Sequence, residues 1–396
     1  MRAAKGEGSI FKTANGYRGY VTVGGMRKYF SGKTKVEASA KRQELLQRKK
    51  KGTLTAGRSM TVEQWLTHYM TSIADLRPKT QTMDEWVIRK HLIPMFGQTP
   101  LDKLTLEQVE EWVASLGLKP SSVRRYVAPL RAAIEEAVRR GKVGHNVVHG
   151  LKLPKVGRRD TSAYSEEDRD AILAAATGWN RARWYIGLVF GIRPAEVLGL
   201  TWPMFDANAG TLTLRYQLLR ITGRGLILQD ATKTEAGERV IRLPRRMVAM
   251  LLEHRKEQML CMAELGDEWK PWEFDGQPVP LMFTQANGRP ISPELDTKRW
   301  KALLASAGLG DERRYKARHT GATHLLQASG GDVALVADIL GHSDASFTMR
   351  TYVHPMEKRA AELAEKMDAP YGAPYEPDDP RSTAERDRTG SAESRG

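Results

Sequence analysis

The stretch from Met60 to about Lys155 constrains the fold most, because apolar residues recur throughout it at helical spacing. Side chains at positions i, i+3, i+4 and i+7 lie on one face of a helix. Thr105 and Ser121 precede two of these runs and are predicted to begin helices. The stretch therefore predicts a compact bundle of four or five helices, whose periodic positions include Val62, Trp65, Leu66, Tyr69, Leu106, Val109, Trp112, Val123, Val127 and Leu130.

The sequence before this bundle has a strand pattern. Residues 7–33 contain three short β-prone runs separated by Asn15-Gly16 and Gly24-Gly25, and such pairs favour hairpin turns. A basic segment with helical character follows. We expect a small three-stranded sheet backed by one helix.

The sequence after the bundle mixes helix and strand patterns. Strands are predicted at 211–217 and 239–244, another strand between them, and a hairpin-like insertion with Asn287-Gly288 at its tip. The last residues are polar and rich in Pro and Gly, which is typical of disorder. The predicted fold class is therefore multidomain: a small β-sheet plus helix domain at 1–55, an all-α helical bundle at 60–155, an α+β domain at 164–368 and a disordered tail at 369–396.

The charge favours a polyanionic partner. The formal net charge is +15, and residues 1–60 hold 15 Lys and Arg against 3 Asp and Glu. Basic side chains on phosphates release counterions, which drives binding to nucleic acid. The residues predicted to contact DNA are Arg18, Tyr20, Arg27, Lys28 and Tyr29, as one basic sheet face, and Arg124 and Arg125 near a helix N-terminus. The alternative is an ordinary meander and helix with solvated charges.

Several protein classes are excluded or disfavoured. No apolar run reaches the roughly 18–20 residues that span a bilayer, and the N-terminus lacks the apolar core of a signal peptide. The single Cys261 excludes a disulfide framework within one chain, and no Cys/His cluster has zinc-site spacing. We expect a cytoplasmic protein without a metal or other cofactor.

Five residues have the chemistry that phosphoryl transfer on DNA needs without a metal. Guanidinium groups can grip a phosphate, an ammonium can protonate a leaving oxygen, and a phenol can act as nucleophile. Each residue alone has an ordinary structural interpretation, such as a surface arginine, a solvated lysine, a helix cap or a buried aromatic ring. In chain order the candidates are Arg193, Lys233, Arg318, His342 and Tyr352.

In their order and surroundings these residues resemble the catalytic domain of the tyrosine recombinases, the phage integrase family. The segments that carry the resemblance are "GIRPAEVLGL", "RVIRLP" after Lys233, "ARHT", "LGHSD" and "TMRTYVH". It covers roughly residues 164–368. The helical bundle resembles the core-binding domain of that family, and the basic N-terminal part resembles its arm-binding domain.

The resemblance implies a mechanism for an integrase of a phage or integrative element. Tyr352 would attack the scissile phosphate and form a 3′-phosphotyrosine link, Arg193 and Arg318 would bind the non-bridging oxygens, and Lys233 would protonate the leaving 5′ oxygen. His342 would support the phosphate or orient Tyr352. Four protomers would exchange strands through a Holliday junction, in the nucleoid of a bacterial host, with a DNA-bending protein and an excision factor as further partners.

One further residue and one further segment have subsidiary roles in this interpretation. Glu196 would orient or pack its helix without reacting. The amphipathic segment 355–367 would dock on a neighbouring protomer or, alternatively, pack on its own domain.

One departure from the family pattern opens an alternative. Tyr315 stands where the family usually has a His, and a phenol with a pKa near ~10 mostly donates hydrogen bonds. Tyr315 would either bond to a phosphate oxygen or only fill space. The alternatives to a recombinase are a catalytically impaired DNA-binding regulator of the same fold, a topoisomerase of the same chemistry, and a metal nuclease.

Overall fold

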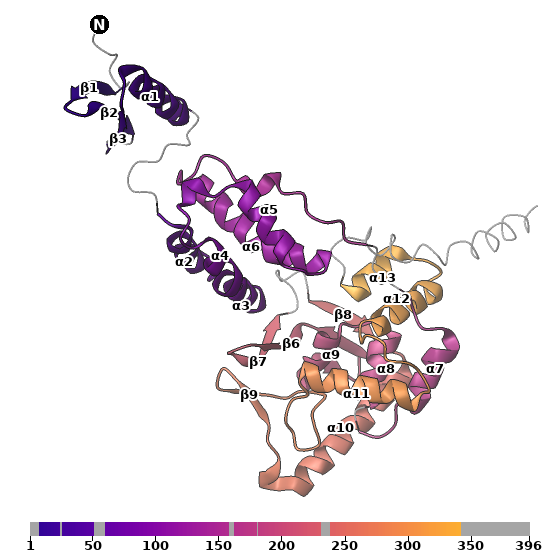
Figure 1. Ribbon diagram of the computed structural model, residues 1–396. Coiled ribbons are helices and arrows are strands. Elements are labelled where there is room, and N and C mark those ends of the chain that lie inside the picture. The colour runs from indigo at the N-terminus through magenta and orange to yellow at the C-terminus, as the bar shows by residue number, and fades with distance from the viewer. Residues whose placement is uncertain are drawn as a thin grey trace, which may run out of the picture. The chain divides into compact units, whose positions relative to one another are not determined.

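The computed structural model describes residues 8–23, 26–50, 60–157, 162–179, 181–230 and 238–341 (Figure 1). Its contacts divide the chain into two compact units. The described residues up to 157, with residues 221–225, form one unit, and the remaining residues form the other. Lys233, His342, Tyr352, the segment 355–367 and the tail from 369 lie outside the described residues.

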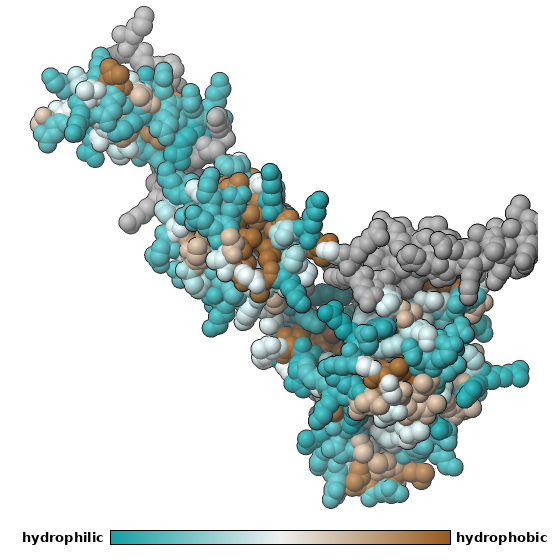
Figure 2. Space-filling view, turned by 45° about the vertical axis from the view of Figure 1, so that its right-hand side comes forward, coloured by the Kyte–Doolittle hydropathy of each residue, from teal (hydrophilic) through white to brown (hydrophobic). Residues whose placement is uncertain are grey.

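The N-terminal part is an antiparallel sheet with one helix, as predicted. The strand order is β1-β2-β3, and the Asn15-Gly16 turn joins the first two strands with Gly16 at a φ of 126°. Val21, Phe30 and Ala38 form a small core between the sheet and the helix. The visible face of this part is mostly hydrophilic (Figure 2). Its elements are β1 (Ser9–Thr13), β2 (Gly16–Val23), β3 (Met26–Gly32) and α1 (Lys35–Lys50).

The central part is the predicted helical bundle. Trp65 lies fully buried in its core and donates a hydrogen bond of 2.8 Å from Nε1 to the carbonyl oxygen of Ala133, which ties the first helix to the last. The elements are α2 (Val62–Ser72), α3 (Pro78–Val87), the π-helix η1 (Ile88–Leu92), α4 (Ile93–Phe96), η2 (Leu101–Lys103), α5 (Leu106–Ser115), α6 (Pro120–Arg139) and η3 (Val147–Gly150).

One predicted helix start in this bundle is confirmed and one is wrong. Thr105 caps α5 in a capping box with Gln108. Helix α6 begins at Pro120 rather than after Ser121, with Lys119 as its N-cap. Proline is favoured at the first helical position because its missing N–H would have no partner there.

The remaining part contains helices and three small sheets. The sheets β4-β5-β8 and β9-β10 are antiparallel, and the third has the order β6-β7. The strand predicted at 211–217 is two strands, which meet at Arg215. Its elements are α7 (Glu166–Ala175), α8 (Arg181–Val189), α9 (Pro194–Leu198), η4 (Trp202–Met204), β4 (Phe205–Asp206), β5 (Thr211–Leu214), β6 (Tyr216–Ile221), β7 (Gly225–Asp230), β8 (Arg239–Arg242), α10 (Arg245–Leu265), η6 (Gly266–Glu268), β9 (Trp272–Phe274), β10 (Gln277–Val279), α11 (Pro293–Ser306), α12 (Lys316–Ala328) and α13 (Val333–Leu340).

The insertion around Asn287-Gly288 is hairpin-like, as predicted. One isolated bridge joins Thr284 to Pro290, and Gly288 at the turn has a φ of 81°. A brown apolar patch lies at the bottom of Figure 2. The exposed apolar side chains of α10 are Leu252, Met259, Leu260 and Met262.

A buried ion cluster joins α8, α11 and the segment before α12. The Asp296 carboxylate lies 2.9 Å from Nη1 of Arg183 and 3.3 Å from Nε of Arg314. Burial lowers the pKa of Arg183 to about 10, although the negative charge of Asp296 acts to raise it. Both guanidinium groups also lie over the ring of Trp184. A buried charge of this kind is stable only while it is paired.

His254, on α10, is buried against aromatic rings from other parts of the chain. Its ring stacks on Phe283 with a centroid distance of 5.1 Å, and its Nε2 lies 2.7 Å from the carbonyl oxygen of Met282. Its Nδ1 has no hydrogen-bond partner among the described residues. Burial, the largest cause, lowers the pKa of His254, so the neutral ring is the form that fits this core.

We predict that His254 makes the stability of this part pH-dependent. Because burial lowers its pKa in the folded chain, the unfolded chain binds the proton more tightly. The stability is therefore fully present above the unfolded-state pKa of ~6.5 and falls as the pH drops below that value. Thermal unfolding of wild type and His254→Phe at pH 7.5 and 5.5 measures this.

The variant should lose less stability on acidification than the wild type. His145→Gln is the matched control, since His145 is exposed. An equal pH effect in wild type and His254→Phe contradicts the prediction.

Candidate active site and DNA-binding surfaces

Arg193 lies at the start of α9, as predicted, and its side chain is one third exposed. Pro194 follows it as the first helical residue. The guanidinium donates to two acceptors: Nη1 lies 2.8 Å from Oε1 of Glu196, and Nη2 lies 2.9 Å from the carbonyl oxygen of Gly341. These contacts fix the orientation of the planar group, which phosphate recognition requires.

Arg318 lies in the first turn of α12, where the sequence predicted it, and only 2% of it is exposed. Nη1 donates to the carbonyl oxygen of Gly191 and Nη2 to that of Leu340, each at 2.8 Å. Gly191 has a φ of 62°, and a Cβ atom on Gly321 would lie 2.3 Å from the Gly191 nitrogen. Glycine at both positions lets α12 approach the loop before α9.

Arg239 is the residue that the sequence analysis missed. It begins strand β8 and is 7% exposed. Nη2 lies 2.7 Å from Oε2 of Glu196, and Nε donates to the carbonyl oxygen of Ile339 at 2.8 Å. The only sequence signal was the apolar alternation of "RVIRLP", which places Arg239 on the same strand face as the buried Ile241.

Three arginines thus bind three consecutive carbonyl groups at the end of α13. Ile339 accepts from Arg239, Leu340 from Arg318, and Gly341 from Arg193. The last carbonyls of a helix lack partners within the helix and carry partial negative charge, so cations stabilise them. The structure therefore brings Arg193 and Arg318 to one turn, directly before His342 in the sequence.

Glu196 is the buried anion of this site, with 2% of it exposed. Burial, the largest influence, would raise the pKa of its carboxyl. The hydrogen bonds and charges of Arg239 and Arg193 outweigh that effect and hold the pKa below its ordinary value. Glu196 therefore orients two arginines, whereas the sequence analysis expected it to orient or pack its own helix.

Tyr315 immediately precedes α12 and is 46% exposed. Its ring lies edge-on against that of His319, with a centroid distance of 5.4 Å. Its carbonyl oxygen accepts the backbone N–H of Arg318 at 3.0 Å. The phenol is thus at the surface, close in sequence to Arg318, and it does not fill space in the core.

The predicted basic face of the N-terminal sheet is formed by two arginines and two tyrosines. The guanidinium of Arg27 lies over the ring of Tyr20 at 4.4 Å, and that of Arg18 over the ring of Tyr29 at 5.7 Å. Such stacking holds the cations in place on a face that the helix leaves uncovered.

Lys28 does not belong to that face. The expectation that it shares one face with Arg18, Tyr20, Arg27 and Tyr29 is wrong. Lys28 pairs with Val21, which is fully buried against the helix. Successive side chains of a strand point to opposite faces, so Lys28 lies on the helix side, between Arg27 and Tyr29.

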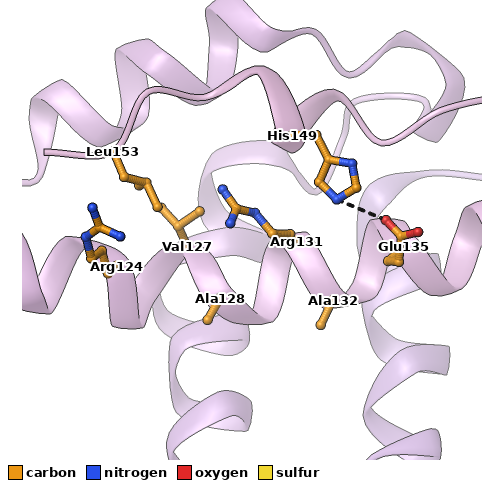
Figure 3. Close-up of a pocket in the computed structure, with 8 residues that line it drawn as sticks. All are labelled: Arg124, Val127, Ala128, Arg131, Ala132, Glu135, His149 and Leu153. Atoms are coloured by element: carbon orange, nitrogen blue, oxygen red, sulfur yellow. Dashed lines mark ion pairs between the residues drawn. The ribbon is translucent and has the colours of Figure 1, made fainter. Parts of the chain in front are cut away.

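Both arginines that were predicted to contact DNA on α6 have partners within the bundle. Nε of Arg124 donates to the carbonyl oxygen of Pro154 at 3.2 Å, and Nη1 of Arg125 lies 2.7 Å from the buried Asp84 carboxylate. Arg124 also borders a shallow groove of about 400 Å³ between α6 and the segment after η3 (Figure 3). The other lining residues are Val127, Ala128, Arg131, Ala132, Glu135, His149 and Leu153.

Among the described residues, no group of three or more His, Cys, Asp or Glu side chains could hold a metal ion. Within the same residues, no helix is long and apolar enough to cross a membrane.

Comparison with known proteins identifies the family of the chain. Residues 164–359 match the model of the phage integrase family, and residues 61–117 match that of the phage integrase N-terminal SAM-like domain. The chain belongs to the phage integrase family. Within it, the chain is a tyrosine-type site-specific DNA recombinase, as the sequence analysis expected.

Individual relatives support this assignment. An integrase of Saccharopolyspora erythraea is 29% identical over 92% of this chain and 97% of its own length. The Tn1549 transposon integrase, solved in complex with transposon right end DNA, has a TM-score of 0.65 and 21% identity over 77% of this chain and 99% of its own. A lambda integrase tetramer bound to a Holliday junction has a TM-score of 0.52 and 16% identity over 86% and 94%.

These two structures share the multidomain fold that the sequence predicted. None of these relatives supports the alternative of an impaired regulator.

We predict that Glu196→Gln destabilises the chain strongly. The change removes the only carboxylate that pairs with Arg239 among the described residues, and breaking a buried pair typically costs about 3–5 kcal/mol. The control is Glu294→Gln, whose pair with Arg220 is exposed and should contribute at most about 1 kcal/mol. Urea unfolding at pH 7 measures both; equal losses for the two variants would refute the assignment of Glu196 as the buried anion.

Proposed function

We propose that this chain integrates the DNA of a phage or mobile element by cutting and rejoining DNA through a 3′-phosphotyrosine link to Tyr352. The observation that carries the proposal is the convergence of Arg193 and Arg318 on the turn at Gly341. Two guanidinium groups that are bound to the same turn can each donate hydrogen bonds to one of the two non-bridging oxygens of a phosphodiester. His342 follows that turn in the sequence, and Tyr352 lies ten residues further on.

In this mechanism the site residues have different tasks. Arg193 and Arg318 stabilise the charge that develops on the phosphate, and losing one such donor typically lowers a rate by about 10²–10³. Lys233 protonates the leaving 5′ oxygen. His342 supports the phosphate or orients Tyr352, and the exposed phenol of Tyr315 donates a hydrogen bond to the DNA.

The bond balance needs no other reactant. The phenol of Tyr352 loses its proton to solvent, its oxygen forms a bond to phosphorus, and the bond from phosphorus to the 5′ oxygen breaks; that oxygen takes a proton from Lys233. In the second step the 5′-hydroxyl of a partner strand gives its proton to the neutral amine of Lys233 and attacks phosphorus, and the tyrosine oxygen leaves and takes up a proton from solvent. Since one phosphoester replaces another in each step, neither a metal ion nor ATP has to supply energy.

The N-terminal sheet supports a second DNA contact. We assign arm-type sites to the domain at 1–55 and core-type sites to the domains at 60–155 and 164–368. Arg18, Tyr20, Arg27 and Tyr29 form an uncovered face in which cations and aromatic rings alternate. Two DNA-binding modules on one chain can bridge separate sites through effective concentration.

Assembly and further partners extend the proposal. A tetramer on the Holliday junction is assigned here because the lambda integrase was solved in that form. We further assign action at the nucleoid of a bacterial cell, with a host DNA-bending protein and an excision factor.

The central test is covalent trapping. Wild type should form a protein–DNA adduct on a nicked suicide substrate carrying its core site, with chelator present and without ATP. Tyr352→Phe should form none, because it lacks the nucleophilic oxygen. A denaturing gel separates adduct from free DNA, and Tyr371→Phe, in the C-terminal tail, is the matched control that should react like the wild type. Adduct formation by Tyr352→Phe would show that another group attacks.

The sheet face makes a prediction about salt dependence. Each phosphate contact contributes about 0.9 to the slope of log K against log salt. Arg18→Gln and Arg27→Gln should therefore each lower the slope on duplex DNA by about 0.9. Lys28→Gln, on the opposite face of the same strand, should leave it nearly unchanged. Fluorescence anisotropy between 50 and 300 mM salt measures the slopes; a larger drop for Lys28→Gln than for Arg27→Gln would contradict the assignment of faces.

A further inference from the structure

Arg239 differs from the two arginines that the mechanism uses. It lies six residues after Lys233 in the sequence, begins a strand and is almost fully buried. Its guanidinium is bound on one edge by the Glu196 carboxylate, at 2.7 and 3.4 Å, and on another by the Ile339 carbonyl at 2.8 Å. It therefore connects strand β8 with helices α9 and α13.

We propose that Arg239 is a positioning residue for DNA cleavage: it holds Glu196 and the end of α13 as one unit, and through them it places Arg193 and the turn that precedes His342. The inference rests on the proposed function, because it concerns the same phosphate. Arg239 itself does not touch the DNA.

The first path runs through Glu196. Oε1 of Glu196 accepts from Nη1 of Arg193, while Oε2 accepts from Nη2 of Arg239. One carboxylate is thus shared by a buried arginine and a partly exposed one. A shift of that carboxylate moves the Arg193 guanidinium with it, and a displacement of 1 Å at such a group can cost on the order of 10²-fold in rate.

The second path runs through the end of α13. Arg239 binds the Ile339 carbonyl, and Arg193 binds the Gly341 carbonyl two residues later. Gly341 has a φ of 65° and ψ of 49°, and a Cβ atom there would lie 2.7 Å from Nη1 of Arg239. The guanidinium therefore packs directly on the glycine that ends the helix. The chain leaves this turn at a position set by Arg239.

The geometry requires the planar shape of arginine and not merely its charge. Nε and the two terminal nitrogens serve acceptors on two different helices. A lysine presents a single ammonium on a flexible stem and cannot serve both acceptors in the same directions. Arg239→Lys therefore keeps the charge beside Glu196 while it loses the bridge to Ile339.

The experiment measures DNA binding and single-turnover cleavage separately, in the full-length protein on the suicide core-site substrate. The variants are Arg239→Lys and Arg239→Gln. The matched controls are Arg242→Lys and Arg242→Gln, three residues along the same strand with an exposed side chain. All proteins are assayed below their unfolding temperatures, which thermal melting establishes first.

We expect both Arg239 variants to bind core DNA within about twofold of wild type. Cleavage at saturating protein should fall about tenfold or more in Arg239→Lys and further in Arg239→Gln. A substrate with a methylphosphonate at the scissile position has lost one anionic oxygen, so the penalty of Arg239→Lys should shrink on it. A residue that only stabilised the fold would lower cleavage equally on both substrates.

The outcomes separate the two proposals. No adduct with the wild type overturns the proposed function. A wild-type adduct with unimpaired cleavage by Arg239→Lys overturns the positioning role alone. So does an equal penalty of Arg239→Lys on the charged and the methylphosphonate substrate. If Arg239→Gln does not fold, Arg239→Lys decides the question by itself.

Discussion

Three consecutive carbonyl groups at the end of α13, those of Ile339, Leu340 and the C-cap Gly341, and the three guanidinium groups that bind them organise the site. Carbonyls at a helix C-terminus have no partners within the helix, and they are usually satisfied by water or by a glycine turn. Here side chains from a helix start, a strand and a helix head supply the donors, although they lie at positions 193, 239 and 318 of the sequence. The turn thereby fixes α9, β8 and α12 relative to one another within this unit. Glu196 brings a negative charge into this group of cations, because its carboxylate pairs with both Arg193 and Arg239.

A second buried cluster fixes the start of α12, the helix that carries Arg318. Asp296 binds Arg314 immediately before Tyr315 and binds Arg183 on α8. Separating the buried Asp296 carboxylate from either cation would cost much free energy. The chain therefore enters α12 at a fixed point. Gly191 and Gly321 then allow close contact between this helix and the loop before α9. Arg318 is therefore held by the backbone around it as much as by its own hydrogen bonds, and its preorganisation does not depend on the DNA.

The sequence predicted those features that local chemistry decides. Helical periodicity gave the bundle with Trp65 in its core, the Asn15-Gly16 turn gave the first hairpin, and the surroundings of Arg193 and Arg318 marked both as site residues. The prediction missed residues whose role depends on partners far away in the sequence. In the sequence, Arg239 is one more basic residue of a strand, and only the fold places Glu196 and Ile339 around it. The prediction for Lys28 was wrong for a simpler reason. Side chains alternate between the two faces of a strand, so Lys28 cannot share the face of its neighbours Arg27 and Tyr29. The start of α6 moved to Pro120 because a proline preference outweighed the capping signal of Ser121.

Tyr315 lies close in sequence to Arg318, but its side chain takes no part in the hydrogen bonds at the end of α13. Its side chain is nearly half exposed and contacts the ring of His319, whereas its backbone carbonyl meets the N–H of Arg318. Replacing an imidazole by a phenol at such a position changes the groups that face solvent and leaves the backbone contacts intact. None of the hydrogen bonds from Arg193, Arg239 or Arg318 to the end of α13 involves the side chain of residue 315. The substitution therefore changes the side chain at the surface before α12, while the hydrogen bonds of the three arginines to the end of α13 are made without it.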